Sequence, residues 1–109
     1  MDYDESADGA IFYLDTSSIK ATGDKRTAWT KVVRETPEPY NGGMLKHWVA
    51  LMEVDCKAQR QRSLSQVGYK PDGTQLYQLG EDKESTPVVP DSVGETRFKR
   101  ICTHKLGVR

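Results

Sequence analysis

The longest strand pattern in the chain runs through residues 48–62, WVALMEVDCKAQRQR, and holds one of only two cysteines. Successive side chains of a strand point to opposite faces. One face of this pattern is therefore wholly apolar, with Trp48, Ala50, Met52, Val54 and Cys56. The other face turns acidic at its far end. We predict that residues 44–57 form the central strand of a sheet, with the apolar face toward the core.

Other segments alternate or are rich in β-formers, and they predict further strands at residues 10–14, 19–21, 26–35, 62–69 and 74–79. Within 26–35, Trp29, Lys31 and Val33 share one face. The turn sequence KPDG at 70–73 predicts a hairpin between the last two strands. Because proline cannot donate to a ladder, Pro37 and Pro39 predict a loop over residues 36–43.

A helix is predicted from Ser92 onward, since Ser92 and Glu95 have the spacing of a capping box. Its apolar face carries Val93, Phe98, Ile101, Cys102 and Leu106, and Gly107 is a predicted C-cap. Four basic residues lie mostly on its other faces: Arg97, Lys99, Arg100 and Lys105. They are either a solvated helix face or a binding patch for an anionic partner.

Strands followed by a terminal helix indicate an α+β domain: an antiparallel sheet of about five to six strands with a C-terminal α-helix packed on one face. A length of 109 residues fits one domain. Residues 1–9 are charged and have little to bury, so we predict a mobile leader there and a single domain over residues 10–109.

The two cysteines lie on the apolar faces of the predicted strand and helix, so their sulfurs can meet if the helix covers that face. A bridge would close a loop of about 46 residues and contribute roughly 4 kcal/mol on the chain-entropy model. Two buried free thiols are the plain alternative. A zinc site with His47 or His104 is another, although paired ligand spacing is absent, and a Cys–His nucleophile is a third.

Composition and motifs exclude several functions. Sixteen basic and sixteen acidic residues cancel, which argues against nucleic-acid binding by bulk charge. No apolar run is long enough to span a membrane, and Met1 is followed by polar sequence, as in a cytosolic protein or a mature domain without its signal peptide.

No cofactor is predicted. Glu53 and Asp55 are either a solvated pair or an acid–base pair, and the two tryptophans, Trp29 and Trp48, either pack or stack on a ligand.

Three short motifs in order along the chain resemble the bacterial surface-adhesin E-like domains. The opening matches at Tyr13, Asp15, Ser18 and Ile19. The central strand matches at Glu53, Asp55, Cys56, Lys57, Arg60 and Arg62. The last motif matches at Pro90, Ser92, Gly94, Glu95 and Cys102. The matches span most of residues 11–102, and the chain departs from the family in its 37–43 loop and after Cys102.

The resemblance implies an antiparallel sheet with a C-terminal helix, a bridge between Cys56 and Cys102, and an exported setting, as a periplasmic protein or a surface lipoprotein. It also implies a non-enzymatic protein-binding domain, with adhesion to host matrix or serum proteins as its most specific form. A small envelope accessory domain that contacts another envelope protein is the alternative. An enzyme would need a pocket with convergent titratable groups.

Overall fold

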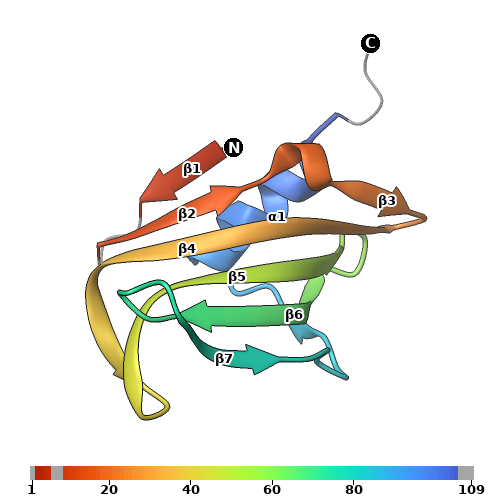
Figure 1. Ribbon diagram of the computed structural model, residues 1–109. Coiled ribbons are helices and arrows are strands. Elements are labelled where there is room, and N and C mark those ends of the chain that lie inside the picture. The colour runs from red at the N-terminus through yellow and green to blue at the C-terminus, as the bar shows by residue number, and fades with distance from the viewer. Residues whose placement is uncertain (1, 6–8, 106–109) are drawn as a thin grey trace.

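The computed structural model describes residues 2–5 and 9–105, which form one antiparallel sheet and one α-helix (Figure 1). The main path of the sheet is β1-β2-β4-β5-β6-β7, and the short β3 and β8 pair with β4 and β6. The predicted α+β class is confirmed. The elements are β1 (Asp2–Glu5), β2 (Ala10–Leu14), the 3-10 helix η1 (Thr16–Ser18), β3 (Lys20–Thr22), β4 (Lys25–Tyr40), β5 (Gly43–Asp55), β6 (Arg60–Tyr69), β7 (Gln75–Leu79), β8 (Thr86–Pro87) and α1 (Val93–Thr103).

The two longest strands, β4 and β5, pair with each other at the centre of the sheet. Their register places Ala28 opposite Met52 and Thr30 opposite Ala50, and all four side chains are buried. The hydroxyl of Thr30 donates to the carbonyl oxygen of Ala50 at 3.1 Å, so this buried polar group is satisfied. The face that alternation assigns to the core is therefore the buried one.

The predicted loop over residues 36–43 is wrong, because β4 continues through both prolines to Tyr40. Asn41 and Gly42 then form a two-residue turn, with φ angles of 50° and 82°, that leads directly into β5. β2 pairs with β4 only as far as Arg34. The prolines thus lie on a strand edge, where no described neighbour requires the N–H groups that they lack.

The N-terminal segment also differs from the prediction. Asp2–Glu5 pair antiparallel with β2, although the sequence predicts no strand before Ala10. The backbone groups at the edge of β2 can pair with any extended segment, so side-chain pattern gives little warning of such a strand. Residues 1 and 6–8 lie outside the described residues, and the mobile leader and the domain boundary at residue 10 stay predictions.

Helix α1 is capped at its N-terminus by Ser92, whose hydroxyl oxygen accepts a bond from the backbone N–H of Glu95 at 3.1 Å. The Glu95 carboxylate accepts from the backbone N–H of Asp91 at 3.2 Å, one residue earlier than a capping box requires. The helix ends at a C-cap on His104. The predicted helical Leu106 and C-cap Gly107 lie outside the described residues.

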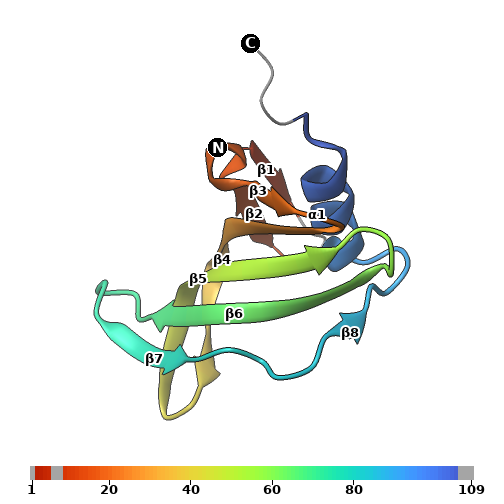
Figure 2. The same cartoon turned by 90° about the vertical axis from the view of Figure 1, so that its right-hand side faces the viewer.

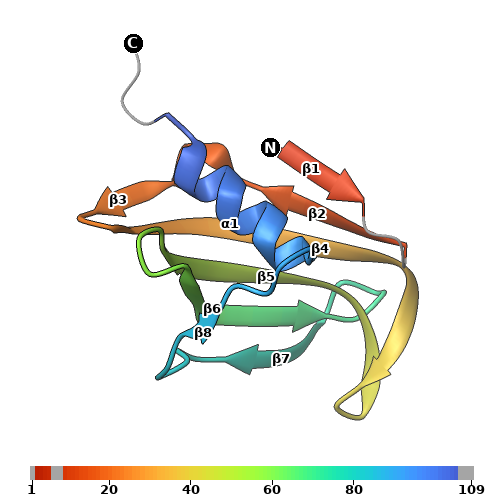
Figure 3. The same ribbon diagram turned by 180° about the vertical axis from the view of Figure 1, so that it is seen from behind.

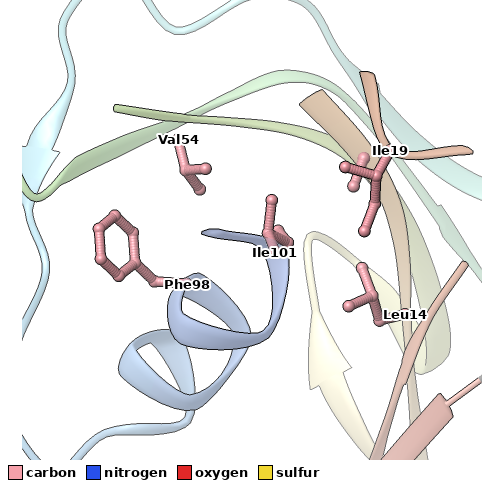
Figure 4. Packing of buried hydrophobic residues seen from close by; sticks show 6 residues of the cluster. Leu14, Ile19, Val54, Phe98 and Ile101 are labelled. Atoms are coloured by element: carbon pink, nitrogen blue, oxygen red, sulfur yellow. The ribbon is translucent and has the colours of Figure 1, made fainter. Parts of the chain in front are cut away.

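The core lies between α1 and one face of the sheet, as seen from behind in Figure 3. In Figure 4, Phe98 and Ile101 of the helix meet Val54 of β5. The complete cluster is Leu14, Ile19, Ala28, Val54, Phe98 and Ile101. Beside it, the predicted disulfide between Cys56 and Cys102 is confirmed, with 5.8 Å between the two Cα atoms. This bond joins the segment after β5 to the end of α1.

The helix covers only part of this inner face. Figure 2 shows α1 beside β4 and β5, with β6 and β7 extending beyond it. At that end, the ring of Tyr77 lies over Gly68, and a Cβ added to Gly68 would overlap the ring. The Tyr77 hydroxyl accepts a bond from the Gln66 amide at 2.6 Å. A tyrosine thus covers the sheet where the helix does not.

Candidate protein-binding surface

The sheet face opposite α1 is covered by no other element of the described chain, and Figure 1 looks directly onto it. We call it the open face. One row crosses four strands, because Tyr13, Lys31, Val49 and Val67 stand opposite one another in the register. The same alternation gives the apolar and aromatic middle of this face: Ile11, Tyr13, Trp29, Lys31, Val33, His47, Val49, Leu51, Val67 and Tyr69. It also places Glu53, opposite Thr27 and Arg62, at the end of the open face.

Most of these side chains are half-buried, but Trp29 is not. Its side chain is 41% exposed, which makes it one of the most exposed large hydrophobic residues described. Trp29 stands opposite Leu51 in the register, at the end of the open face nearer η1. Tryptophan is the residue type most enriched among the energetically dominant positions of protein interfaces. An uncovered sheet face with an exposed tryptophan is therefore a candidate docking surface.

Two aromatic contacts order the middle of the open face. The rings of His47 and Tyr69 stack, with centroids 4.6 Å apart, and the Lys31 ammonium lies 6.0 Å from the centroid of the Tyr13 ring. Burial lowers the pKa of His47, and the charges of Lys31 and Lys46 lower it further. His47 is therefore neutral at pH 7, so Lys31 is the charged residue in the middle of the open face, while Glu53 and Arg62 pair with each other at its end.

The acidic residues at the end of β5 have structural partners. Glu53 forms an ion pair with Arg62 on β6 at 2.8 Å. The Asp55 carboxylate accepts from the backbone N–H groups of Lys57 and Ala58, at 3.1 and 2.9 Å, and so stabilises the turn between β5 and β6. Both carboxylates line one shallow pocket of about 260 Å³ with several basic side chains, but each already bonds a structural partner. Their geometry supports the solvated, structural interpretation over an acid–base pair.

The four basic residues of the predicted patch differ in burial, and Arg97 and Lys99 have different partners. Arg97 lies under the helix, and its guanidinium donates to the Gln61 side chain of β6 at 3.2 Å. Lys99 is exposed and pairs with Glu95 at 3.7 Å, one turn away. Arg100 is half-buried, whereas Lys105 is exposed beyond the helix end. A common basic surface of these four residues stays a prediction without geometric support.

Sequence reasoning did not single out the open face, although one signal was available. Alternation places Trp29, Lys31 and Val33 together, but it leaves open whether the tryptophans pack or stack on a ligand. Trp48 is half-buried on the inner face, while Trp29 is exposed. The tip of the β4–β5 hairpin was missed as well. It presents Tyr40 and Met44, which are 44% and 42% exposed.

The structure offers little for a metal or a thiol nucleophile. Both cysteines are consumed by the disulfide, so neither can act as a thiolate ligand for zinc or attack a substrate. Across residues 2–5 and 9–105, no three His, Cys, Asp or Glu side chains gather as a metal site would require. No helix in this part of the chain is long and apolar enough to cross a membrane.

These features define a disulfide-linked α+β domain in which α1 covers one sheet face and leaves the other uncovered. A family model described as surface-adhesin protein E matches residues 1–103. The chain therefore belongs to the surface-adhesin protein E family, as its three motifs suggest. Membership supports an adhesin-like, protein-binding role rather than an enzymatic one. A comparison with curated proteins finds no match.

Proposed function

We propose that this chain is a non-enzymatic, extracytoplasmic protein-binding domain that docks its partner on the open face. The observation that carries the proposal is the uncovered sheet face with Trp29 exposed among half-buried apolar and aromatic neighbours. Interfaces commonly place such an anchor inside a ring of contacts that exclude water. Family membership supports a protein as the partner.

The extracytoplasmic setting rests on the disulfide. Such bonds persist in oxidising compartments and are rare in the cytosol, where thiols are kept reduced. The family description, surface-adhesin protein E, points the same way. Periplasm and cell surface both satisfy this chemistry. Adhesion to host matrix or serum proteins is the most specific form of the proposal.

Binding to immobilised matrix and serum proteins tests the docking surface. Trp29→Ser is expected to weaken binding by about 2 kcal/mol, or roughly thirtyfold in Kd. Val89→Ser is the matched control, because Val89 is 62% exposed but lies in the loop before α1. We expect this variant to bind like the wild type. Since Lys31 is the charge in the middle of the open face, and Glu53 and Arg62 pair with each other, added salt should weaken binding only modestly.

Other outcomes contradict parts of the proposal. Equal binding by wild type and Trp29→Ser would move the docking surface away from the open face. If no host protein binds but an envelope protein co-purifies, and Trp29→Ser abolishes that association, the domain is an accessory of the envelope and not an adhesin.

The compartment is tested separately, by intact mass after alkylation on protein recovered from its native location. We expect no thiol to react under denaturing conditions until a reductant is added. Alkylation of Cys56 and Cys102 without reductant would contradict the extracytoplasmic setting.

A further inference from the structure

We propose that the inner face carries a second site, a small pocket beside α1 that binds a free α-amino acid through its carboxylate and ammonium groups. The pocket has a volume of about 230 Å³ and lies between α1, β5, β6 and the segment before β8. Its walls include Arg97 on one side and Asp82 and Glu84 on another. It opens on the sheet face opposite the open face, so it is independent of the proposed docking surface.

The hydrogen-bonding capacity of Arg97 is only partly satisfied by the protein. One of its terminal nitrogens donates to Gln61, but its Nε is buried and has no hydrogen-bond partner in the described structure. Burial lowers the pKa of the Arg97 guanidinium, since no carboxylate of the described chain offsets the desolvation. A largely desolvated guanidinium whose one partner is neutral is costly. A carboxylate matches a guanidinium, as a phosphate also does, because it can accept two parallel N–H bonds.

Two carboxylates line the same pocket without pairing to Arg97. Asp82 and Glu84 are exposed, and neither comes within 4.0 Å of the Arg97 nitrogens in the described ion pairs. The Asp82 side chain accepts one weak bond, from the backbone N–H of Ser63 at 3.3 Å. Arg97 and the two carboxylates therefore line the same pocket without forming an ion pair across it. A ligand with both a carboxylate and an ammonium would complement each side.

The apolar floor of the pocket and its volume further restrict which ligands can bind. Trp48, Ala50 and Met52 of β5 line it, so an apolar side chain has a surface to contact. The volume lies below the range of roughly 300–1,000 Å³ that is typical of pockets for drug-sized molecules. A single amino acid with an apolar side chain fits these limits. A folded protein surface does not enter such a pocket.

Titration of the wild-type domain with L-leucine, L-phenylalanine and L-alanine, followed by amide and indole NMR signals, tests the proposal. We expect millimolar or tighter binding that perturbs Trp48 and the amides of α1. L-leucinamide lacks the carboxylate and should bind at least tenfold more weakly than L-leucine. N-acetyl-L-leucine lacks the ammonium and should also lose affinity. These ligand pairs test the two charge contacts without changing the protein.

A matched pair of variants on α1 locates the site. Arg97→Gln should lose at least tenfold in affinity for L-leucine, whereas Lys99→Gln removes an exposed charge from the same helix and should bind as the wild type does. The proposal is overturned if no amino acid binds at millimolar concentration, if L-leucine and L-leucinamide bind equally, or if a folded Arg97→Gln variant keeps full affinity. Should that variant fail to fold, the wild-type comparison of L-leucine with L-leucinamide decides the question.

Discussion

The two faces of the sheet are built from alternate residues of the same strands, yet they differ in exposure. On the inner face, Val54 of β5 is 0% exposed, as is Ile101 of the helix that covers it. On the open face, Trp29 is 41% exposed and its apolar neighbours are half-buried. The middle of each face holds apolar side chains of β4 and β5, although the open face also carries Lys31 and turns acidic at Glu53. The larger difference between a core and a candidate interface here is the presence of α1.

This comparison shows why the disulfide matters to function. The bond between Cys56 and Cys102 ties α1 to the segment after β5, and so helps to select which apolar face is covered. The other face is left for a partner. A domain of this size has one modest core. An apolar face in excess of that core is best explained by an external contact.

The largest expected loss of stability comes from removing the disulfide that links α1 to the sheet. The double variant Cys56→Ser/Cys102→Ser opens a loop that spans 46 residues, and should lose about 4 kcal/mol of unfolding free energy. Chemical denaturation with and without reductant measures it. Reductant should destabilise the wild type by a similar amount and leave the double variant unchanged. If the double variant is as stable as the oxidised wild type, the disulfide does not hold α1 in place.

A pair of truncations compares the faces directly. Ile101→Ala removes a fully buried side chain from the covered face and should cost about 3 kcal/mol. Leu51→Ala removes a half-buried side chain from the open face and should cost about 1 kcal/mol. Denaturant midpoints of both variants give the comparison. Equal losses that grow with protein concentration would show that a second copy covers the open face.

The end of the inner face that α1 leaves uncovered gives a third test. Gly68→Ala places a methyl group against the ring of Tyr77 and should cost about 2 kcal/mol, because the ring must move or the strands must separate. Gly80→Ala is the control, since a Cβ there meets no atom within 4 Å. Thermal unfolding of both variants measures the difference. A neutral Gly68→Ala would mean that Tyr77 does not pack on β6.

Much of the covered side was predictable from sequence. Period-two alternation from Trp48 to Cys56 identifies the inner face of β5, and the capping residue Ser92 marks where α1 begins. The pairing of Cys56 with Cys102 followed from these faces together with the family motifs. Each of these inferences depends on local pattern, and the physics of alternation and capping is local as well.

The open face and the pocket depend on packing that no local pattern encodes. Alternation groups Trp29 with Lys31, but it does not say which face the helix will cover. Helical spacing puts Arg97 off the apolar stripe, yet its guanidinium turns under α1 to reach Gln61, which is distant in sequence. The two prolines predict a loop, because a strand can hold proline only where its backbone N–H needs no partner. They lie on such an edge because β2 pairs with β4 only as far as Arg34, and the sequence does not show where that pairing stops.

The smallest expected effect concerns the charge state of the open face. The pKa of His47 lies below its ordinary value of about 6.5, because burial and two nearby lysines disfavour the imidazolium. The unfolded chain therefore binds more protons than the folded one as the pH falls below about 6.5, so stability decreases until the folded-state pKa is passed. An NMR titration should place the His47 midpoint below the ordinary histidine value of about 6.5. His47→Gln should flatten the decrease in stability over the same pH range, and an unchanged slope would assign it to other groups.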